Sequence, residues 1–252
     1  MSSANLEKFQ NLTFEGFREL AKDESLSSHE KVGFPDSYRD GKEKAIFNDI
    51  KLKIPNLARS KQTVVDIGPG CGALAFSLIE QCRINQNTLV LIDSEEMLAQ
   101  LPDDDFLIKV PAYYPDKCQS LIEEYTGKAD VVLTYSVLHY VFDEGNLFKF
   151  LDLSLALLAV GGEFLIGDIP NVSKRNRFFN SPTGVKYHRE FMKTDDEPQV
   201  NFSRLETGQM DDAVLMSLIT RARNFGFDAY IVAQSDDLPM ANRREDILIK
   251  RP

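Results

Sequence analysis

Short apolar runs alternate with amphipathic stretches along the chain from residue 62 onward. The apolar runs are rich in aliphatic and β-branched side chains and predict seven strands, at 63–67, 88–93, 106–109, 130–134, 162–168, 227–233 and 246–250. The intervals between them predict helices at 72–83, 95–101, 115–126, 144–159 and 211–225. This alternation is typical of parallel βαβ units, so the sequence predicts an α/β protein with a doubly wound sheet and helices on both faces.

The stretch 144–159 has the clearest helical period. Leu147, Phe150, Leu151 and Leu155 recur at intervals of three and four, and the glycine pair at 161–162 follows as a stop signal. The stripe predicts a helix face that packs into the core, not a binding surface.

Two segments fall outside the alternation. Residues 1–60 contain apolar positions at helical spacing, a turn-prone stretch and a predicted helix at 42–52, which indicates a helical cap over one end of the sheet. Residues 61–252 form the α/β domain, and 170–210 fill a long gap between its fifth strand and the next helix. Long insertions of this kind are commonly lids or binding segments, so we expect a substrate cap there.

Composition narrows the class of protein. The 252 residues are 43% hydrophobic and 27% charged, typical of a globular protein, and no apolar run is long enough to span a membrane. The first thirty residues show no signal-peptide pattern, and the three cysteines lack metal-like spacing, so we expect a cytoplasmic protein without a metal site. The net charge of −10 argues against nucleic acid as a partner.

The stretch VVDIGPGCGAL at 64–74 places three glycines within five residues directly after the first strand. Glycines at a strand-to-helix turn let a ligand lie against the backbone, and the next helix offers its N-terminal amides, which suits a nucleotide-like ligand. Asp93 ends the second strand, where its carboxylate can accept both hydroxyls of a ribose. The alternative is that Asp93 caps the following helix, a role Ser94 can equally fill. The loop also fits the dinucleotide fingerprint, so a nicotinamide cofactor stays open.

Together, VVDIGPGCGAL, LVLIDSEEML, ADVVLTYSVLHYVFD and LLAVGGEFLIGDIP resemble the ordered motifs of class I S-adenosylmethionine-dependent methyltransferases, over about residues 60–250. The resemblance implies a Rossmann-like seven-stranded sheet whose last strand is antiparallel and pairs with the sixth. It also implies S-adenosylmethionine as the cofactor and methyl transfer as the reaction.

The resemblance further implies a cofactor site. Asp66 and the loop of Gly68, Pro69, Gly70 and Gly72 would hold the amino acid end, Asp93 the ribose, and Ser94 and Met97 one side of the adenine. The family often has an aspartate at the end of strand three, where this sequence reads KVPAY, so a backbone group near Ala112 would replace it. Tyr135 and Ser136, directly after the fourth predicted strand, are further candidate cofactor-binding residues. Arg39 is the candidate for the cofactor carboxylate, or a surface arginine in a turn.

Candidate acceptor residues follow the fourth and fifth strands. His139 is the candidate general base, since its ordinary pKa suits proton transfer near neutral pH; the alternative is a half-buried histidine packed beside Tyr140. The insertion concentrates cations in an acidic chain, which indicates an anionic acceptor or, alternatively, a solvated loop. The candidate substrate-binding residues are Tyr38, Tyr140, Lys174, Arg175, Arg177, Arg243 and Arg244.

GDIPNVSKRNRFF and NRREDILI are also similar to methyltransferases of bacterial capsule and surface-polysaccharide clusters. This similarity implies a phosphorylated or nucleotide-linked small-molecule acceptor in capsule biosynthesis. An NAD(P)-dependent oxidoreductase and a non-catalytic nucleotide-binding protein are the alternatives. The oligomeric state is open, a dimer included.

Overall fold

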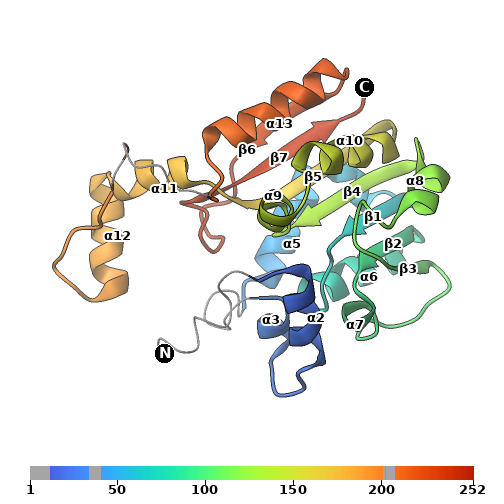
Figure 1. Ribbon diagram of the computed structural model, residues 1–252, viewed down its shortest axis with the longest axis horizontal. Coiled ribbons are helices and arrows are strands. Elements are labelled where there is room, and N and C mark those ends of the chain that lie inside the picture. Colours follow the sequence, from blue (N-terminus) through green and yellow to red (C-terminus); the bar gives the residue numbers. More distant parts are fainter. Residues whose placement is uncertain (1–11, 34–40, 201, 203–207) are drawn as a thin grey trace.

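A seven-stranded sheet with the order β3-β2-β1-β4-β5-β7-β6 forms the centre of the protein (Figure 1). The computed structural model describes residues 12–33, 41–200, 202 and 208–252. Neighbouring strands from β3 to β5 are parallel, and β7 runs antiparallel to both β5 and β6. The predicted doubly wound α/β sheet with an antiparallel last strand is confirmed. The strands are β1 (Thr63–Ile67), β2 (Thr88–Asp93), β3 (Leu107–Pro111), β4 (Ala129–Tyr135), β5 (Leu158–Pro170), β6 (Asp228–Val232) and β7 (Arg244–Lys250).

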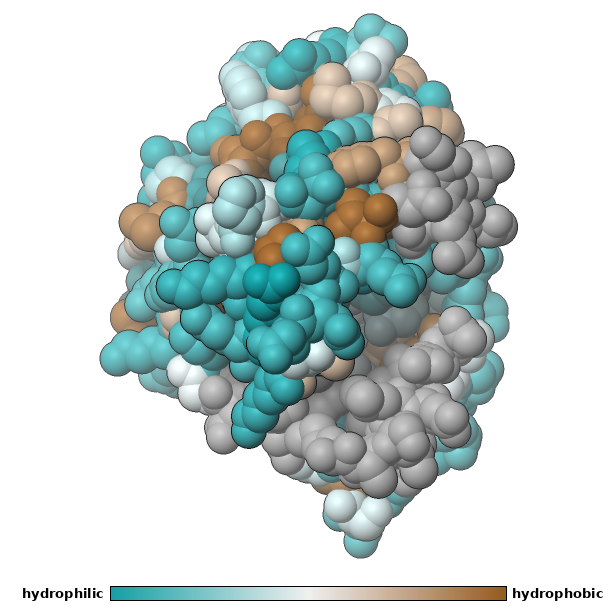
Figure 2. Space-filling model, turned by 90° about the vertical axis from the view of Figure 1, so that its left-hand side faces the viewer, coloured by the Kyte–Doolittle hydropathy of each residue, from teal (hydrophilic) through white to brown (hydrophobic). Residues whose placement is uncertain are grey.

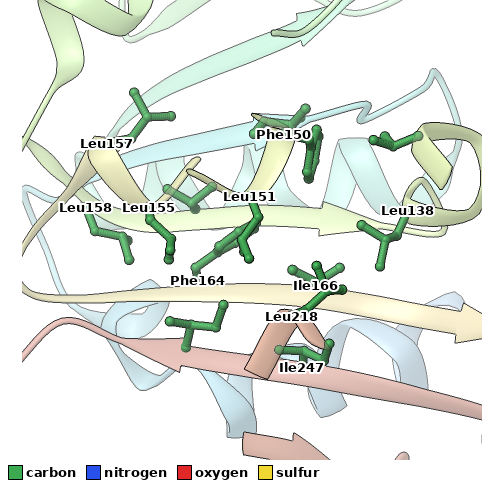
Figure 3. Packing of buried hydrophobic residues seen from close by; sticks show 14 of the residues in the cluster. Leu138, Phe150, Leu151, Leu155, Leu157, Leu158, Phe164, Ile166, Leu218 and Ile247 are labelled. Atoms are coloured by element: carbon green, nitrogen blue, oxygen red, sulfur yellow. The ribbon is translucent and has the colours of Figure 1, made fainter. Parts of the chain in front are cut away.

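Both faces of the sheet are buried, which explains the nearly continuous apolar runs of β1 and β2. Along β1, Val65 and Ile67 join one hydrophobic core, and Val64 joins the other, because successive side chains point to opposite faces. Figure 3 shows part of the first core, where Phe150, Leu151 and Leu155 gather near Phe164 and Ile166.

The two cores are closed by different helices. The first core is covered by α8 (Gln119–Tyr125), α9 (Leu138–Glu144), α10 (Leu147–Leu157) and α13 (Asp212–Asn224). The second is covered by α5 (Glu43–Lys53), the 3₁₀ helix η1 (Pro55–Ala58), α6 (Ala73–Asn85) and α7 (Glu95–Leu98). All three cysteines, Cys71, Cys82 and Cys118, are buried, as expected of small core residues.

The start of β5 differs from the prediction. The strand begins at Leu158, directly after α10, so the glycine pair at 161–162 lies inside the strand and does not stop the helix. A Cβ on Gly162 would lie 2.8 Å from the carbonyl oxygen of Ala129. Close approach of β4 therefore explains this glycine.

The helices that the sequence did not predict include α9, directly after β4. They also include α11 (Val172–Phe179) and α12 (Pro182–Met192) in the insertion. In Figure 1, α11 and α12 project away from the sheet. On the N-terminal side, α2 (Phe14–Lys22) packs beside α7, and α3 (Ser28–Lys31) packs beside α2. None of the described helices is long and apolar enough to cross a membrane.

Candidate functional site

The glycine loop after β1 is shaped by two residues with left-handed backbone. Gly68 and Gly70 have φ angles of 76° and 62°, a conformation that disfavours other residues. A Cβ on Gly68 would lie 2.6 Å from a methyl carbon of Val137, and one on Gly70 would lie 2.6 Å from a methyl carbon of Val32. Both glycines are therefore required by backbone conformation and by close packing on each side of the loop.

Asp93 connects the end of β2 to this loop. Its Oδ2 accepts a hydrogen bond from the Gly70 backbone N–H at 2.9 Å, and its Oδ1 accepts one from the Ser94 N–H at 2.7 Å. The N-cap of α7 is Ser94, whose hydroxyl accepts from the Met97 N–H. Ser94 therefore performs the helix-capping role that was the alternative for Asp93. Burial raises the pKa of Asp93 to about 6, although its two backbone hydrogen bonds lower it.

Asp66 lies behind the loop and has only 5% of its surface exposed. Burial, and then the charge of Asp93, raise the pKa of Asp66 to about 8, so its carboxyl group is mostly protonated at neutral pH. It is not among the described residues that line the pocket. The contact between Asp66 and the ammonium group of the cofactor stays a prediction.

A pocket opens at the carboxyl edge of the sheet, beside the glycine loop. The sequence-predicted residues that line it are Gly68, Pro69, Gly70, Gly72, Asp93, Met97, Ala112, Tyr135, Ser136 and Tyr140. The described lining does not include Ser94 or His139, and Tyr38 and Arg39 lie outside the described residues. Residues that sequence reasoning missed in the lining include Phe14, Phe17, Val32, Glu43, Ile46, Tyr113, Tyr114, Val137, Val141, Glu144 and Phe150.

Helix α2 closes one side of this pocket with aromatic rings. Phe14 meets Tyr113 edge to face with ring centroids 5.0 Å apart, and Phe17 meets Tyr140 in the same way at 4.8 Å. On the outer side of α2, the Arg18 guanidinium donates to both carboxylate oxygens of Glu96 on α7, at 2.8 and 2.7 Å. Helix α2 of the N-terminal segment therefore contributes directly to the pocket.

The charged side chains in the described pocket lining are all carboxylates. They are Glu43, Asp93 and Glu144, and no lysine or arginine of the described residues lines the pocket. Glu144 also accepts a hydrogen bond from the Phe14 backbone N–H at 3.2 Å. A site of this charge favours a cationic ligand and disfavours phosphate groups.

The carboxyl ends of β4 and β5 meet in a strained polar pair next to the pocket. Ser136 and Asp168 have φ angles of 62° and 59°, which are uncommon outside glycine and often mark functional sites. The Ser136 hydroxyl donates to Oδ2 of Asp168, which also accepts from Arg244 Nη1 at 2.9 Å. Ser136 lines the pocket, and Asp168 holds the Ser136 hydroxyl from outside the described lining.

Behind this pair lies a buried polar network. Gln234 donates from Nε2 to Asp168 at 3.4 Å and to Asp246 at 3.0 Å, and Lys53 donates to Asp246 at 2.7 Å. Burial raises the pKa of Asp246, while Lys53 opposes that shift. The network joins residues from β5, β7, α5 and the β6–β7 connection, so no local sequence pattern could have predicted it.

His139, the predicted base, packs beside Tyr140 with ring centroids 3.9 Å apart. Tyr140 lines the pocket and His139 does not, because adjacent residues of α9 differ by about 100° in direction. This ring contact is the one that the packing alternative expected, and the role of His139 as a base stays a prediction.

The cations of the insertion also lie outside the described pocket lining. Lys174 donates to the backbone oxygen of Arg244 at 2.8 Å, Arg177 pairs with Asp212, and the Arg175 guanidinium lies 5.4 Å from the centre of the Phe179 ring. These three cations therefore do not line the described pocket, and the substrate cap expected at 170–210 stays a prediction.

Comparison with protein-family models and with curated proteins found no match. Solved structures share the fold. One is the CurJ carbon methyltransferase, with a TM-score of 0.55 and 15% identity over 99% of this chain and 67% of that chain. Another is the plantazolicin methyltransferase BpumL, solved with a triazolic desmethylPZN analog and SAH, with a TM-score of 0.55 and 13% identity over 98% of this chain and 99% of that chain.

A SAM-dependent methyltransferase from Aquifex aeolicus is similar as well, with a TM-score of 0.53 and 10% identity over 90% of this chain and 100% of that chain. At these identities the comparisons establish the shared Rossmann-like fold. They give no support to the resemblance to surface-polysaccharide methyltransferases.

Proposed function

We propose that this protein binds S-adenosylmethionine and transfers its methyl group to a small acceptor. The observation that carries the proposal is the charge of the pocket beside the glycine loop, which contains Glu43, Asp93 and Glu144 and no cation among its described residues. The cofactor carries a sulfonium cation and an ammonium group, both of which such a pocket favours. The pyrophosphate of a nicotinamide dinucleotide would be repelled. The shared fold of known methyltransferases supports the same conclusion.

The residues present suit the cofactor. The carboxylate of Asp93 would accept the ribose hydroxyls, while its bonds to Gly70 and Ser94 hold the carboxylate in place. The backbone of the glycine loop would face the amino acid end, and Met97 and the backbone near Ala112 would flank the adenine. Arg39 stays a prediction for the cofactor carboxylate.

Bound S-adenosylmethionine would supply an electrophilic methyl carbon. The protein would align the acceptor with this carbon and exclude water, with α2 and its phenylalanines closing the pocket. The Ser136 hydroxyl hydrogen is engaged by Asp168, so Ser136 presents oxygen lone pairs to a ligand and favours a group that donates hydrogen bonds. We propose alignment, and not proton removal by His139, as the main source of rate.

For the acceptor, the described pocket favours an uncharged or cationic group. The anionic, phosphorylated or nucleotide-linked acceptor suggested by the insertion would meet carboxylates there and no described lysine or arginine.

Titration calorimetry tests this proposal. S-adenosylhomocysteine should bind with a Kd of roughly 1–100 μM, and NAD⁺ should give no heat of binding at the same concentrations. Binding of NAD⁺ without binding of S-adenosylhomocysteine would overturn the proposal in favour of a nicotinamide cofactor.

A further inference from the structure

The insertion after β5 forms a helical arm, defined here as residues 172–193, that is firmly attached at its base. Asn171 caps α11 by accepting hydrogen bonds from the N–H groups of Ser173 and Lys174, at 2.9 and 3.2 Å. The Asn171 amide also donates to Asp212 at 2.8 Å, and the Val172 N–H donates to the Met210 carbonyl at 2.9 Å. The arm therefore leaves the body in a defined direction.

The two helices of the arm pack tightly against each other. A Cβ on Gly184 would lie 2.0 Å from the carbonyl oxygen of Phe178, so only glycine fits where α12 crosses α11. The ring centroids of Tyr187 and Phe178 lie 5.6 Å apart. Tyr187 also stacks on Phe191, with ring centroids 5.8 Å apart and an 8° angle between the ring planes. These contacts make the arm a preformed unit.

The outer part of the arm is left without a covering layer among the described residues. In Figure 1, α12 stands away from the sheet and its helices, and the element it packs against is α11. Phe191 and Met192 are 60% and 58% exposed. A helix of eleven residues is marginal alone and is normally stabilised by burying its apolar face. We expect a partner to cover this face.

The charge of the arm indicates which partner. Residues 172–193 contain six lysines and arginines and one glutamate, whereas the whole chain has a net charge of −10, so the body is strongly acidic. Figure 2 views the molecule from the side of the arm and shows hydrophilic residues over much of this face, with hydrophobic patches among them. The body of a second copy offers the opposite charge to the arm, and two arms facing each other would repel.

We propose that this chain forms a two-fold symmetric dimer in which the arm of each copy packs against the acidic body of the other. Phe191 and Met192 supply the apolar contact, and Lys186 and Arg189 supply the charge. Within its own chain, Lys186 pairs with Glu190 at 3.9 Å and Arg189 pairs with Glu197 at 3.3 Å. Both ion pairs are exposed and contribute little to stability, so the two cations can pair with carboxylates of the second copy instead. A closed arrangement of this kind uses the same contact twice.

Light scattering coupled to size-exclusion chromatography tests the dimer with the full chain. At about 50 mM salt the mass should be twice the 28.5 kDa of one chain, and the dimer Kd should rise tenfold or more at about 500 mM salt because screening weakens the charged contact. The double variants Phe191→Ser/Met192→Ser and Lys186→Glu/Arg189→Glu should each be monomeric. Leu52→Ser, at a position 83% exposed on α5, is the matched control and should leave the dimer intact.

A cross-link identifies the surface that the arm contacts. Because the three native cysteines are buried, a benzophenone maleimide should label Met192→Cys selectively and cross-link it to an acidic segment of a second copy. A monomeric wild-type protein, or a dimer whose mass neither arm variant changes, would overturn the proposal. The proposal would also be overturned if the protein is a monomer that slows the migration of transfer RNA in a gel, and the arm variants lose this effect. Binding of S-adenosylhomocysteine, measured on every variant, reports separately on the fold and on the proposed function.

Discussion

Replacing Asp93 with asparagine tests the cofactor site most informatively, because this carboxylate has one role in the structure and a second in the proposed function. It holds the glycine loop through the Gly70 N–H, and it would accept the ribose hydroxyls. Hydrogen bonds to a charged acceptor contribute about 1.5–3 kcal/mol each, so losing one or more should weaken S-adenosylhomocysteine binding by roughly tenfold to several hundredfold at about pH 7.5.

The pH dependence adds a second, independent expectation. Since burial raises the pKa of Asp93 to about 6, protonation of the free protein below that pH removes the charged acceptor. The affinity of the wild-type protein should therefore fall by up to about tenfold per pH unit below about pH 6. Asp66, with a pKa raised to about 8, stays protonated through this range and does not add a second step.

Calorimetric titration with S-adenosylhomocysteine between about pH 5 and about pH 8 measures both effects. Asp93→Asn should bind weakly with little dependence on pH, and Ser94→Ala, which removes the cap of α7, should keep the wild-type pH profile. An Asp93→Asn protein with normal affinity, or one that retains the step near pH 6, would refute the assignment of the ribose to this residue.

Three further predictions concern stability and closure. The raised pKa of Asp66 makes the wild-type protein lose stability as pH rises from about 5 to about 7. The free energy of unfolding of Asp66→Asn, measured in urea, should therefore rise relative to wild type by about 1 kcal/mol per pH unit over this range. Parallel pH profiles of the two proteins would show that Asp66 is ionised. Ser136→Gly should be more stable than Ser136→Ala by about 1 kcal/mol, since only glycine adopts a φ of 62° without strain; equal stabilities would contradict this. Arg18→Ala removes the ion pair with Glu96 and should speed chymotrypsin cleavage within α2, and bound S-adenosylhomocysteine should slow that cleavage. A cleavage rate that Arg18→Ala does not change would show that the Arg18–Glu96 pair does not hold the helix.

Much of the sheet could be predicted from the sequence. The bounds of β1 and β2 match the prediction because each is a buried apolar run that ends at the functional edge of the sheet. The glycine loop and Asp93 were identifiable for the same reason, since loop and acid follow those two strands directly.

The missed features depend on tertiary contacts or on helix phase. The network of Ser136, Asp168, Gln234 and Asp246 forms only once four separate segments meet. His139 was proposed as the base because of its ordinary pKa, and Tyr140 as a substrate-binding residue. No helix was predicted at 138–143, and the phase of α9 decides that Tyr140 lines the described pocket and His139 does not.

The direction of the insertion depends on contacts that its own sequence does not contain. Its charge and length did not indicate in which direction it extends from the body. That direction is set by hydrogen bonds at the base of the arm, which join it to residues near the start of α13. Its cations therefore indicated an anionic acceptor at a site that they do not line in the described structure.

A crystal structure of the complex with S-adenosylhomocysteine tests the central claim most directly. The account predicts that both ribose hydroxyls lie within about 2.5–3.0 Å of the Asp93 carboxylate, with the adenine between Met97 and the backbone at Ala112. A ligand bound outside this pocket, or one whose ribose contacts other residues while Asp93 stays only on Gly70 and Ser94, would contradict it.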